Sequence, residues 1–279
     1  MHLFMILTTL TVAWIVRCSG DHLQGSWDVR WRRSLFLFLF PPLLIFMTAI
    51  AVLFMGPQGT MGGIDTGWLS YELALIFLVF LAILCLILAG QGWRSVLSAR
   101  KSPLVSLGDK QVRLLSTDVA FAGQIGFWYP ELVVSQGLLQ TLSPAHVDSV
   151  LAHEQGHYHY RDTFWFFWLG WIRACTSWLP NTDFLWEELL VLRELRADSY
   201  AASLVDPLLL AESLLLVVSN SSLSSQICCA ALGTNDNERL EQRIDALLAP
   251  PEPTPKINWR FWNNFLLAFF PLVSVIFHN

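Results

Sequence analysis

Long apolar stretches are the feature that most constrains how this chain can fold. A helix needs about 20 mostly apolar residues to cross a hydrocarbon core about 30 Å thick. Four stretches approach or reach that length, at residues 1–16, 34–55, 69–90 and 261–277. Charged residues make up 14% of the chain, against about 25% in ordinary soluble domains. The sequence therefore predicts a mainly α-helical membrane protein with about four transmembrane helices.

The first stretch, residues 1–16, has two interpretations. No Lys or Arg precedes its apolar part, and no clear small-x-small cleavage pattern follows it. A removed signal peptide normally shows both features. We therefore expect an uncleaved first span rather than a signal peptide.

Basic residues predict the orientation, because Lys and Arg gather in cytoplasmic loops. Segments 17–33 and 94–113 are rich in them, whereas segment 56–68 contains neither. We expect a multi-pass protein of a bacterial plasma membrane, with its N-terminus outside and an active site on the cytoplasmic side. The net charge of -5 gives no reason to expect nucleic-acid binding.

Composition divides the chain into three regions. Residues 1–90 are expected to form a membrane region with three transmembrane helices, and residues 261–279 to hold a fourth. Residues 91–260 have a more mixed composition and are expected to form a cytoplasmic-facing domain. β-Branched and aromatic residues at 112–121 and 131–135 predict short strands there. The expected fold of this domain is α+β with a small β-sheet.

The run His153-Glu154-Gln155-Gly156-His157 is an H-E-x-x-H motif. Histidines at i and i+4 lie on one helical face, so both imidazoles can reach one metal ion. Glu154 lies beside them, where a carboxylate can take a proton from water at the metal and pass it to a leaving amine. The pattern predicts a zinc site with Glu154 as catalytic base.

The helix that carries this motif should begin at Ser143-Pro144, an N-cap hydroxyl followed by proline, and run to about Arg161. Two other histidines belong to the same helix. His146 lies about two turns before the motif and is interpreted either as a solvated position or as a residue lining a cleft. His159 lies on another face of the helix and is expected at the surface or in packing.

A catalytic zinc ion with two histidine ligands needs a third protein ligand and leaves a fourth position to water. Glu194 is the best candidate in the downstream sequence. Asp198 shares its helical face at i+4. If Glu194 binds the metal, Asp198 can hydrogen-bond a ligating histidine and fix its tautomer.

The hydrophobic segment 164–179 cannot cross the membrane alone, because Glu194 would then be separated from the histidine pair. A mid-segment arginine and several tryptophans are typical of an interface or a cavity wall. We expect a re-entrant or interfacial helix pair within residues 164–192, with a two-crossing hairpin as the alternative. Just before it, Arg161 and Asp162 are expected to form a structural ion pair rather than to act in catalysis.

Four runs occur in an order that resembles a known group of proteases. They are GLLQTLSPAHVDSVLA, HEQGHYHYRD, ELRADSYAA and ERLEQRIDALL. Together they resemble the integral-membrane gluzincins, and within that group the BlaR/MecR-type antibiotic-sensing metallopeptidases. The heat-shock (HtpX-like) and Ste-type membrane proteases are more distantly similar. The resemblance covers roughly residues 100–250, and it is specific because several motifs keep their order and distances.

The resemblance implies roles residue by residue. The positions that match the zinc ligands are His153, His157 and Glu194. Glu154 matches the general base, Asp198 matches the acidic residue that supports the site, and Arg243 matches an arginine near the cleft. Unlike the sensor proteins, this chain shows no segment resembling an extracellular penicillin-binding domain after the final span, so direct β-lactam sensing is not expected.

Three functions are compatible with these observations. The leading hypothesis is regulatory proteolysis in signal transduction, in which a cytoplasmic or membrane-associated protein such as a transcriptional repressor is cleaved. The second is a quality-control protease for membrane proteins. The third is a membrane receptor or scaffold with a structural zinc site. The presence of Glu154 argues against this hypothesis, because a structural zinc site needs no catalytic base. The expected partners are a protein substrate and the lipid bilayer, and the expected cofactor is Zn²⁺.

Overall fold

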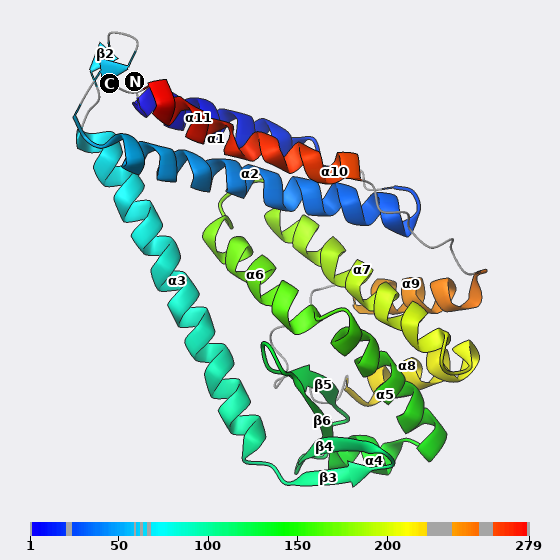
Figure 1. Ribbon diagram of the computed structural model, residues 1–279. Helices are drawn as coiled ribbons and strands as arrows, with labels where there is room; N and C mark the ends of the chain where they lie inside the picture. The colour runs from blue at the N-terminus through cyan, green and yellow to red at the C-terminus, as the bar shows by residue number, and fades with distance from the viewer. Residues whose placement is uncertain are drawn as a thin grey trace. The chain divides into compact units, whose positions relative to one another are not determined.

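The computed structural model describes residues 2–20, 24–58, 60–61, 64–65, 68–221, 236–250 and 259–277. It is mainly helical, with one two-stranded and one four-stranded sheet (Figure 1). The chain divides into two compact units. Unit 1 comprises Met1–Leu88, Leu169–Leu189 and Pro253–Asn279, and unit 2 comprises Ala89–Trp168 and Leu190–Glu252. The predicted boundary near residue 260 lies beside residues 251–258, which are outside the described ranges.

Apolar helices dominate unit 1. They are α1 (His2–Cys18), α2 (Trp27–Met55), most of α3 (Trp68–Arg100), α10 (Trp259–Asn264), η1 (Phe265–Phe269), α11 (Phe270–Val273) and η2 (Ser274–Phe277). The two strands β1 (Thr60–Met61) and β2 (Ile64–Asp65) pair between α2 and α3. Within unit 1, α1 and the C-terminal helical segments pack along α2.

Two of the four predicted spans, α2 and α3, are long and apolar enough to cross a membrane, with mean hydropathies of 2.5 and 3.2. The other two are shorter. α1 has 17 residues, and the last stretch is divided into short α and 3-10 segments. Pro271, at the start of α11, contributes to that division because proline removes a backbone donor. A bundle of four spans thus remains a prediction.

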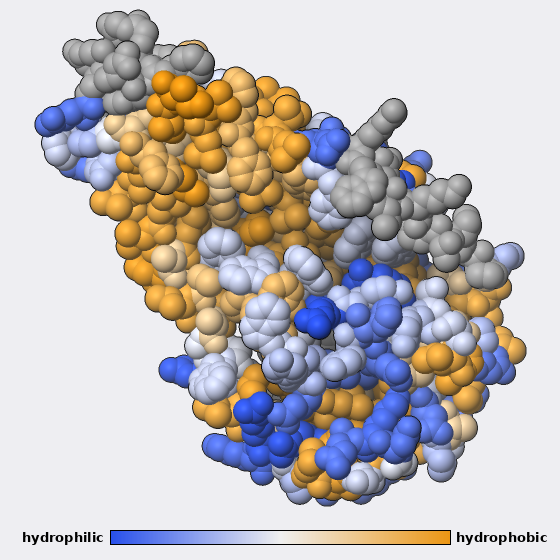
Figure 2. All heavy atoms as spheres, viewed as in Figure 1, coloured by the Kyte–Doolittle hydropathy of each residue, from blue (hydrophilic) through white to orange (hydrophobic). Residues whose placement is uncertain are grey.

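α3 exposes many apolar side chains, and the orange surface at the upper left of Figure 2 covers the first part of this helix. Only 11% of its most apolar window is buried, against 67% for α2. A helix that is hydrophobic all round and unburied within its own chain is typical of a segment in contact with lipid or with another protein.

A helix pair is expected within residues 164–192, and the structure has α6 (Asp162–Cys175) and α7 (Thr182–Ala202) there, with α7 continuing well beyond residue 192. Their ends in unit 1 are joined by an ion pair between Arg173 and Asp183 at 2.8 Å. Arg30 of α2 also holds α7, through two bonds of 2.7 and 2.9 Å to the carboxylate of Glu188. Whether the pair is re-entrant or interfacial stays a prediction.

The sheet of unit 2 has the strand order β3-β4-β6-β5. Its strands are β3 (Leu104–Leu107), β4 (Lys110–Leu115), β5 (Ala122–Ile125) and β6 (Glu131–Ser135), and only the β4–β6 pair is parallel. The strand predicted at 131–135 is confirmed. The strand predicted at 112–121 is confirmed over residues 112–115 but extends too far, because β4 ends at Leu115. The chain leaves the sheet there, and the Gly137 N–H donates to the carbonyl of Thr117 at 2.9 Å.

One face of this sheet packs against α4 (Gln136–Thr141) and α5 (Pro144–His159). The buried core between them includes Val112, Val134, Leu138, Leu142, Val147 and Leu151. α5 begins as predicted, since Ser143 Oγ accepts the backbone N–H of His146 and Pro144 opens the helix. It ends at His159, slightly before the expected Arg161, which has a left-handed φ of 53°. α8 (Pro207–Ser221) and α9 (Asp236–Leu248) complete the described part of unit 2.

Candidate metal centre

The centre forms where α5 and α7 approach each other at Gly156. A Cβ built on Gly156 would lie 3.0 Å from the Cα and 3.1 Å from the carbonyl oxygen of Ala197. Real Cβ contacts are seldom so short, so a side chain at this position would force the helices apart. The small fourth residue of H-E-x-x-H therefore permits Glu194, one turn before Ala197, to reach the histidine pair.

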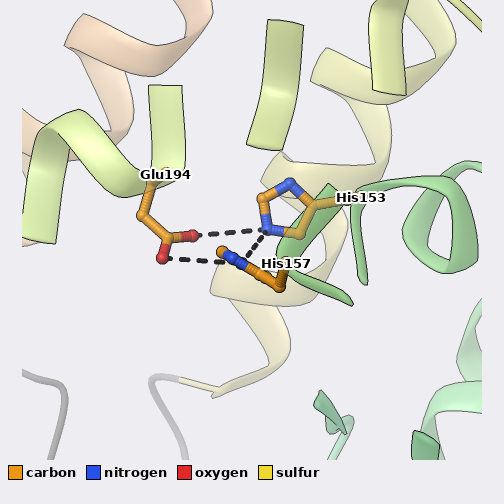
Figure 3. Close-up of side chains that lie close together, drawn as sticks. All are labelled: His153, His157 and Glu194. Atoms are coloured by element: carbon orange, nitrogen blue, oxygen red, sulfur yellow. Dashed lines mark hydrogen bonds and ion pairs between the residues drawn. The ribbon is translucent and has the colours of Figure 1, made fainter. Parts of the chain in front are cut away.

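Three predicted ligands converge in Figure 3, from α5 and α7. The Nε2 atoms of His153 and His157 are 3.1 Å apart. Oε2 of Glu194 lies 3.3 Å from His153 Nε2, and its Oε1 lies 3.7 Å from His157 Nε2. All candidate ligand atoms are within 4.8 Å of one another.

These separations fit a tetrahedral metal ion. Nitrogen and oxygen ligands about 2.0–2.2 Å from zinc stand roughly 3.3–3.5 Å apart in that geometry. Two imidazoles and one carboxylate are also the donor set of known catalytic zinc sites. The group can hold a divalent metal, and zinc as the particular ion remains a prediction.

Each histidine is backed by a carboxylate on its other nitrogen. Nδ1 of His153 lies 2.8 Å from Oδ1 of Asp198, and Nδ1 of His157 lies 2.7 Å from Oδ2 of Asp162. A carboxylate in this position favours the tautomer with its proton on Nδ1 and leaves the Nε2 lone pair free for a metal. The helical spacing pointed to Asp198, and the structure brings it to His153.

The contact of Asp162 with His157 was missed by the sequence reasoning, which paired Asp162 with Arg161. In the structure α5 ends before Arg161, and the left-handed turn there brings Asp162, the first residue of α6, back to the histidine. A carboxylate soon after the motif, where the helix ends, was the signal that could have revealed it.

Three arginines hold the acidic groups. Arg243 binds both oxygens of Asp198, at 2.7 and 2.8 Å, and its Nη1 lies 3.6 Å from Glu194. Arg196 pairs with Asp162. Arg193 donates to Oε1 of Glu194 at 2.7 and 2.9 Å. The arginine that the sequence placed near the cleft thus contacts two acidic groups of the centre.

Burial and neighbouring charges shift the pKa values of these groups. Burial lowers the pKa of His153, but Asp198 and Glu194 raise it more, to about 10. Burial raises the pKa of Asp198, but Arg243 and His153 lower it more, to below its usual value. For Glu194, burial is likewise outweighed by Arg193 and the two histidines, so its pKa lies well below the usual range. A metal ion binding here has to displace protons from histidine rather than from the carboxylates.

Glu154 is buried at the same turn of α5, with 7% of its surface exposed. Its Oε2 has no hydrogen-bond partner among the described residues. The Nε2 of Gln124, on β5, donates to the backbone carbonyl of Glu154 at 3.3 Å. The backbone of Glu154 is thus tied to β5, and one oxygen of its buried carboxylate makes no hydrogen bond within the described residues.

The other two histidines of α5 lie outside this cluster. Nδ1 of His146 is 2.6 Å from Ser143 Oγ, and its Nε2 is 3.3 Å from Glu212. His159 is exposed, and its ring stacks on Tyr200 with centroids 4.9 Å apart. His146 is therefore engaged at the helix start, and no contact of it with the metal cluster is seen in the described part of the chain.

Comparison with known proteins gives one family. No curated protein matches the chain. The model of peptidase family M48 matches residues 105–188, which include the sheet and the histidine pair. Glu194, Asp198 and Arg243 lie beyond the matched segment. Together with the His-His-Glu group, the match supports a metallopeptidase of family M48.

Proposed function

We propose that this protein is a membrane-embedded zinc metalloprotease, an endopeptidase that cleaves a cytoplasmic or membrane-associated protein. The single observation that carries the proposal is the convergence of His153, His157 and Glu194, with a carboxylate behind each histidine and the buried Glu154 beside them. A structural metal site has no use for a buried carboxylate with an unbonded oxygen. The finer resemblance to BlaR/MecR-type and HtpX-like proteins belongs to this proposal as well.

The residues divide the chemistry among them. Zinc, when bound, polarises the scissile carbonyl and lowers the pKa of water toward about 7. Asp198 and Asp162 hold the two imidazoles with their Nε2 atoms facing Glu194. Glu154 takes the proton from the attacking water at its free oxygen and returns it to the leaving amine.

β5 offers a place for an extended substrate. It is an edge strand of the sheet, and Gln124 ties it to the backbone of the motif helix. A peptide segment added to this edge would be held by main-chain hydrogen bonds without demanding particular side chains. The scissile bond would then lie alongside the turn of α5 that carries Glu154.

The regulatory role is the leading part of the proposal, with a transcriptional repressor as the kind of substrate. α2 and α3 support a membrane location, and α7 favours regulation because it is one unbroken helix from Thr182 to Ala202. Its first part is bound by Arg30 of α2, and its later part carries Glu194. Quality control of membrane proteins is the second candidate, favoured by the exposed apolar surface of α3.

The experiment compares new protein N-termini in cells that carry the wild type or Glu154→Gln at matched membrane levels. Loss of a general base lowers turnover by about 10²- to 10⁴-fold, while the metal ligands are unchanged. A few cytoplasmic cleavages lost in the variant would support regulatory proteolysis and identify the target. Many lost membrane-protein fragments would favour quality control.

Metal content is the matched control. Purified Glu154→Gln should retain zinc, whereas Glu194→Gln should lose most of it. Wild-type function that persists in Glu154→Gln, with equal metal content, would revive the receptor or scaffold hypothesis and overturn the protease.

A further inference from the structure

Unit 2 carries a cluster of aromatic rings that the proposed chemistry does not use. We name it the aromatic platform, and its members are Phe127, Trp128, Phe164, Trp165, Phe167 and Trp168. The first two come from the turn between β5 and β6, and the others from the first half of α6, beside which that turn lies in Figure 1.

Phe127 is the centre of the platform. Its ring lies 5.0 Å from Phe164, 5.1 Å from Phe167 and 6.2 Å from Trp168. Trp128 packs in turn on Phe164 at 4.8 Å. Aromatic pairs at these separations stabilise each other beyond their buried area. The turn is therefore fixed to α6 rather than free to move as a loop tip.

The backbone of the turn fixes its direction too. Gly126 has a φ of 142°, and a Cβ there would lie 2.8 Å from the Cα of Pro130. Between these two residues the chain presents Trp128 and Tyr129, which are 59% and 86% exposed. Large aromatic rings stabilise a structure mainly when they are buried, so rings that a tight turn holds in solvent indicate a surface that is covered by a partner.

The chemistry of the exposed rings indicates the partner. Trp165 is 57% exposed and Trp168 36% exposed, so the platform and Tyr129 together present tryptophan and tyrosine rather than Leu or Ile. Rings with an apolar body and a polar edge are enriched where the hydrocarbon of a bilayer meets water. A pocket that binds an apolar peptide side chain would not require the polar edges of Trp and Tyr rings.

Chain continuity indicates the same partner. α6 runs without a break from the platform into unit 1, whose α2 and α3 are the candidate spans. On α3, the exposed Trp68 and Trp93 stand about 37 Å apart at about 1.5 Å per residue. That separation matches a hydrocarbon core of about 30 Å with part of each interface. The helix therefore leaves the expected bilayer near Trp93, only a few residues after unit 2 begins at Ala89.

We propose that the aromatic platform, with Tyr129, is a membrane-docking surface that inserts into the headgroup region of the cytoplasmic leaflet. The β5–β6 turn then sits at the bilayer surface together with the start of α6. The inference rests on the membrane location in the proposed function, but it does not depend on zinc chemistry.

The test measures depth in vesicles of phosphatidylethanolamine and phosphatidylglycerol. The full chain, with its cysteines replaced by serine, carries one environment-sensitive fluorophore on Tyr129→Cys. Lipids that bear a quencher near the headgroup or near the chain end report the depth of the label. Phe80→Cys, near the middle of α3, serves as the deep reference. Ser116→Cys is the aqueous control, because it follows β4 at the end of the sheet away from the β5–β6 turn.

Docking predicts strong quenching of the label at 129 by the headgroup quencher, weaker quenching by the deep quencher, and little quenching at 116. If the label at 80 is quenched deeply but the label at 129 behaves like that at 116, the platform faces water or a protein and the docking proposal is wrong, while the membrane location stands. An unquenched label at 80 would overturn both. Retained zinc in each labelled protein excludes misfolding as the cause.

Discussion

At the scale of residues, Gly156 sets the distance between the histidine pair and the third ligand. Its packing against Ala197 predicts that Gly156→Ala pushes α7 away from α5 and weakens metal binding by about tenfold or more, because overpacking typically costs about 1–3 kcal/mol. Competition with a chelator measures the affinity.

The matched control separates the side chain of Ala197 from its backbone. Ala197→Gly removes only the Cβ, 3.3 Å from a new methyl at position 156, and leaves the Cα and carbonyl oxygen at 3.0 and 3.1 Å, so the double variant should recover little of the lost zinc affinity. A single variant with unchanged affinity, or a double variant that regains the wild-type affinity, would contradict the role of this backbone contact.

Protons compete with the metal at the same centre. The pKa of His153 is raised from 6.5 to about 10, so zinc affinity should rise by up to about tenfold per pH unit for each proton displaced, as long as the pH stays below about 10. For the metal-free fold the sign is opposite. Its stabilisation by protonated His153 is complete below pH 6.5 and is lost as the pH rises toward 10.

Chelator titration and thermal unfolding across this range measure the two effects. Asp198→Asn, which removes the charge that raises the pKa, should flatten both slopes. Metal affinity that is independent of pH would contradict the protonated state of the centre.

The sequence predicted those residues of the centre that lie close together on one helix. Histidines four apart share a face in any helix, and the same holds for Glu194 and Asp198. The contact of Asp162 with His157 depends on a left-handed residue at 161, and the pairing of Arg243 with Asp198 spans 45 positions. Neither follows from helical periodicity.

At the scale of elements, the edge of β5 is the part of the proposed substrate site that can be tested by backbone changes. Ser135 N–H donates to the carbonyl of Phe121, and hydrogen-bonded pairs alternate along an antiparallel ladder. The backbone groups of Ala122 and Gln124 should therefore face the free edge. Ala122→Pro, which removes an outward donor, should impair cleavage while zinc content is preserved.

Gln124→Ala separates the backbone from the side chain, because it keeps the outward N–H and removes only the bond to Glu154. The fragments identified by N-terminal mapping provide the readout. Equal cleavage by Ala122→Pro and the wild type would remove the edge from the substrate site.

Elements were predicted well where a local signal marks the boundary, as at Ser143 and Pro144 for α5 and at residues 131–135 for β6. The strand prediction based on β-propensity alone continued beyond Leu115. The residues that follow Leu115 belong to a connection, and the direction of that connection is set by β6. Parallel pairing of β4 with β6 requires the chain to cross over, and that requirement is tertiary.

At the scale of the whole molecule, the distribution of basic residues predicts opposite sides for the two ends of α3. A cysteine at Pro57, before the helix, should react with an impermeant reagent in intact cells. A cysteine at Ser102, after it, should react only once the membrane is opened. The opposite pattern would place the centre outside the cell, and labelling of both in intact cells would argue against a spanning α3.

At this scale the apolar composition of the sequence predicted a candidate span correctly for α3, whose apolar side chains are largely unburied. It was less informative about α1 and the C-terminal helical segments, which pack along α2 within unit 1. Hydropathy cannot tell a helix that faces lipid from one that is covered by its own chain.

The close approach of Gly156 and Ala197 also has an evolutionary consequence. Two positions about forty residues apart, each unremarkable in its own helix, share one small volume. A lineage that enlarges position 156 meets the backbone of residue 197, which no substitution there removes, and gives up the third ligand. Among descendants of this sequence a side chain at position 156 should therefore mark a copy that has lost its metal.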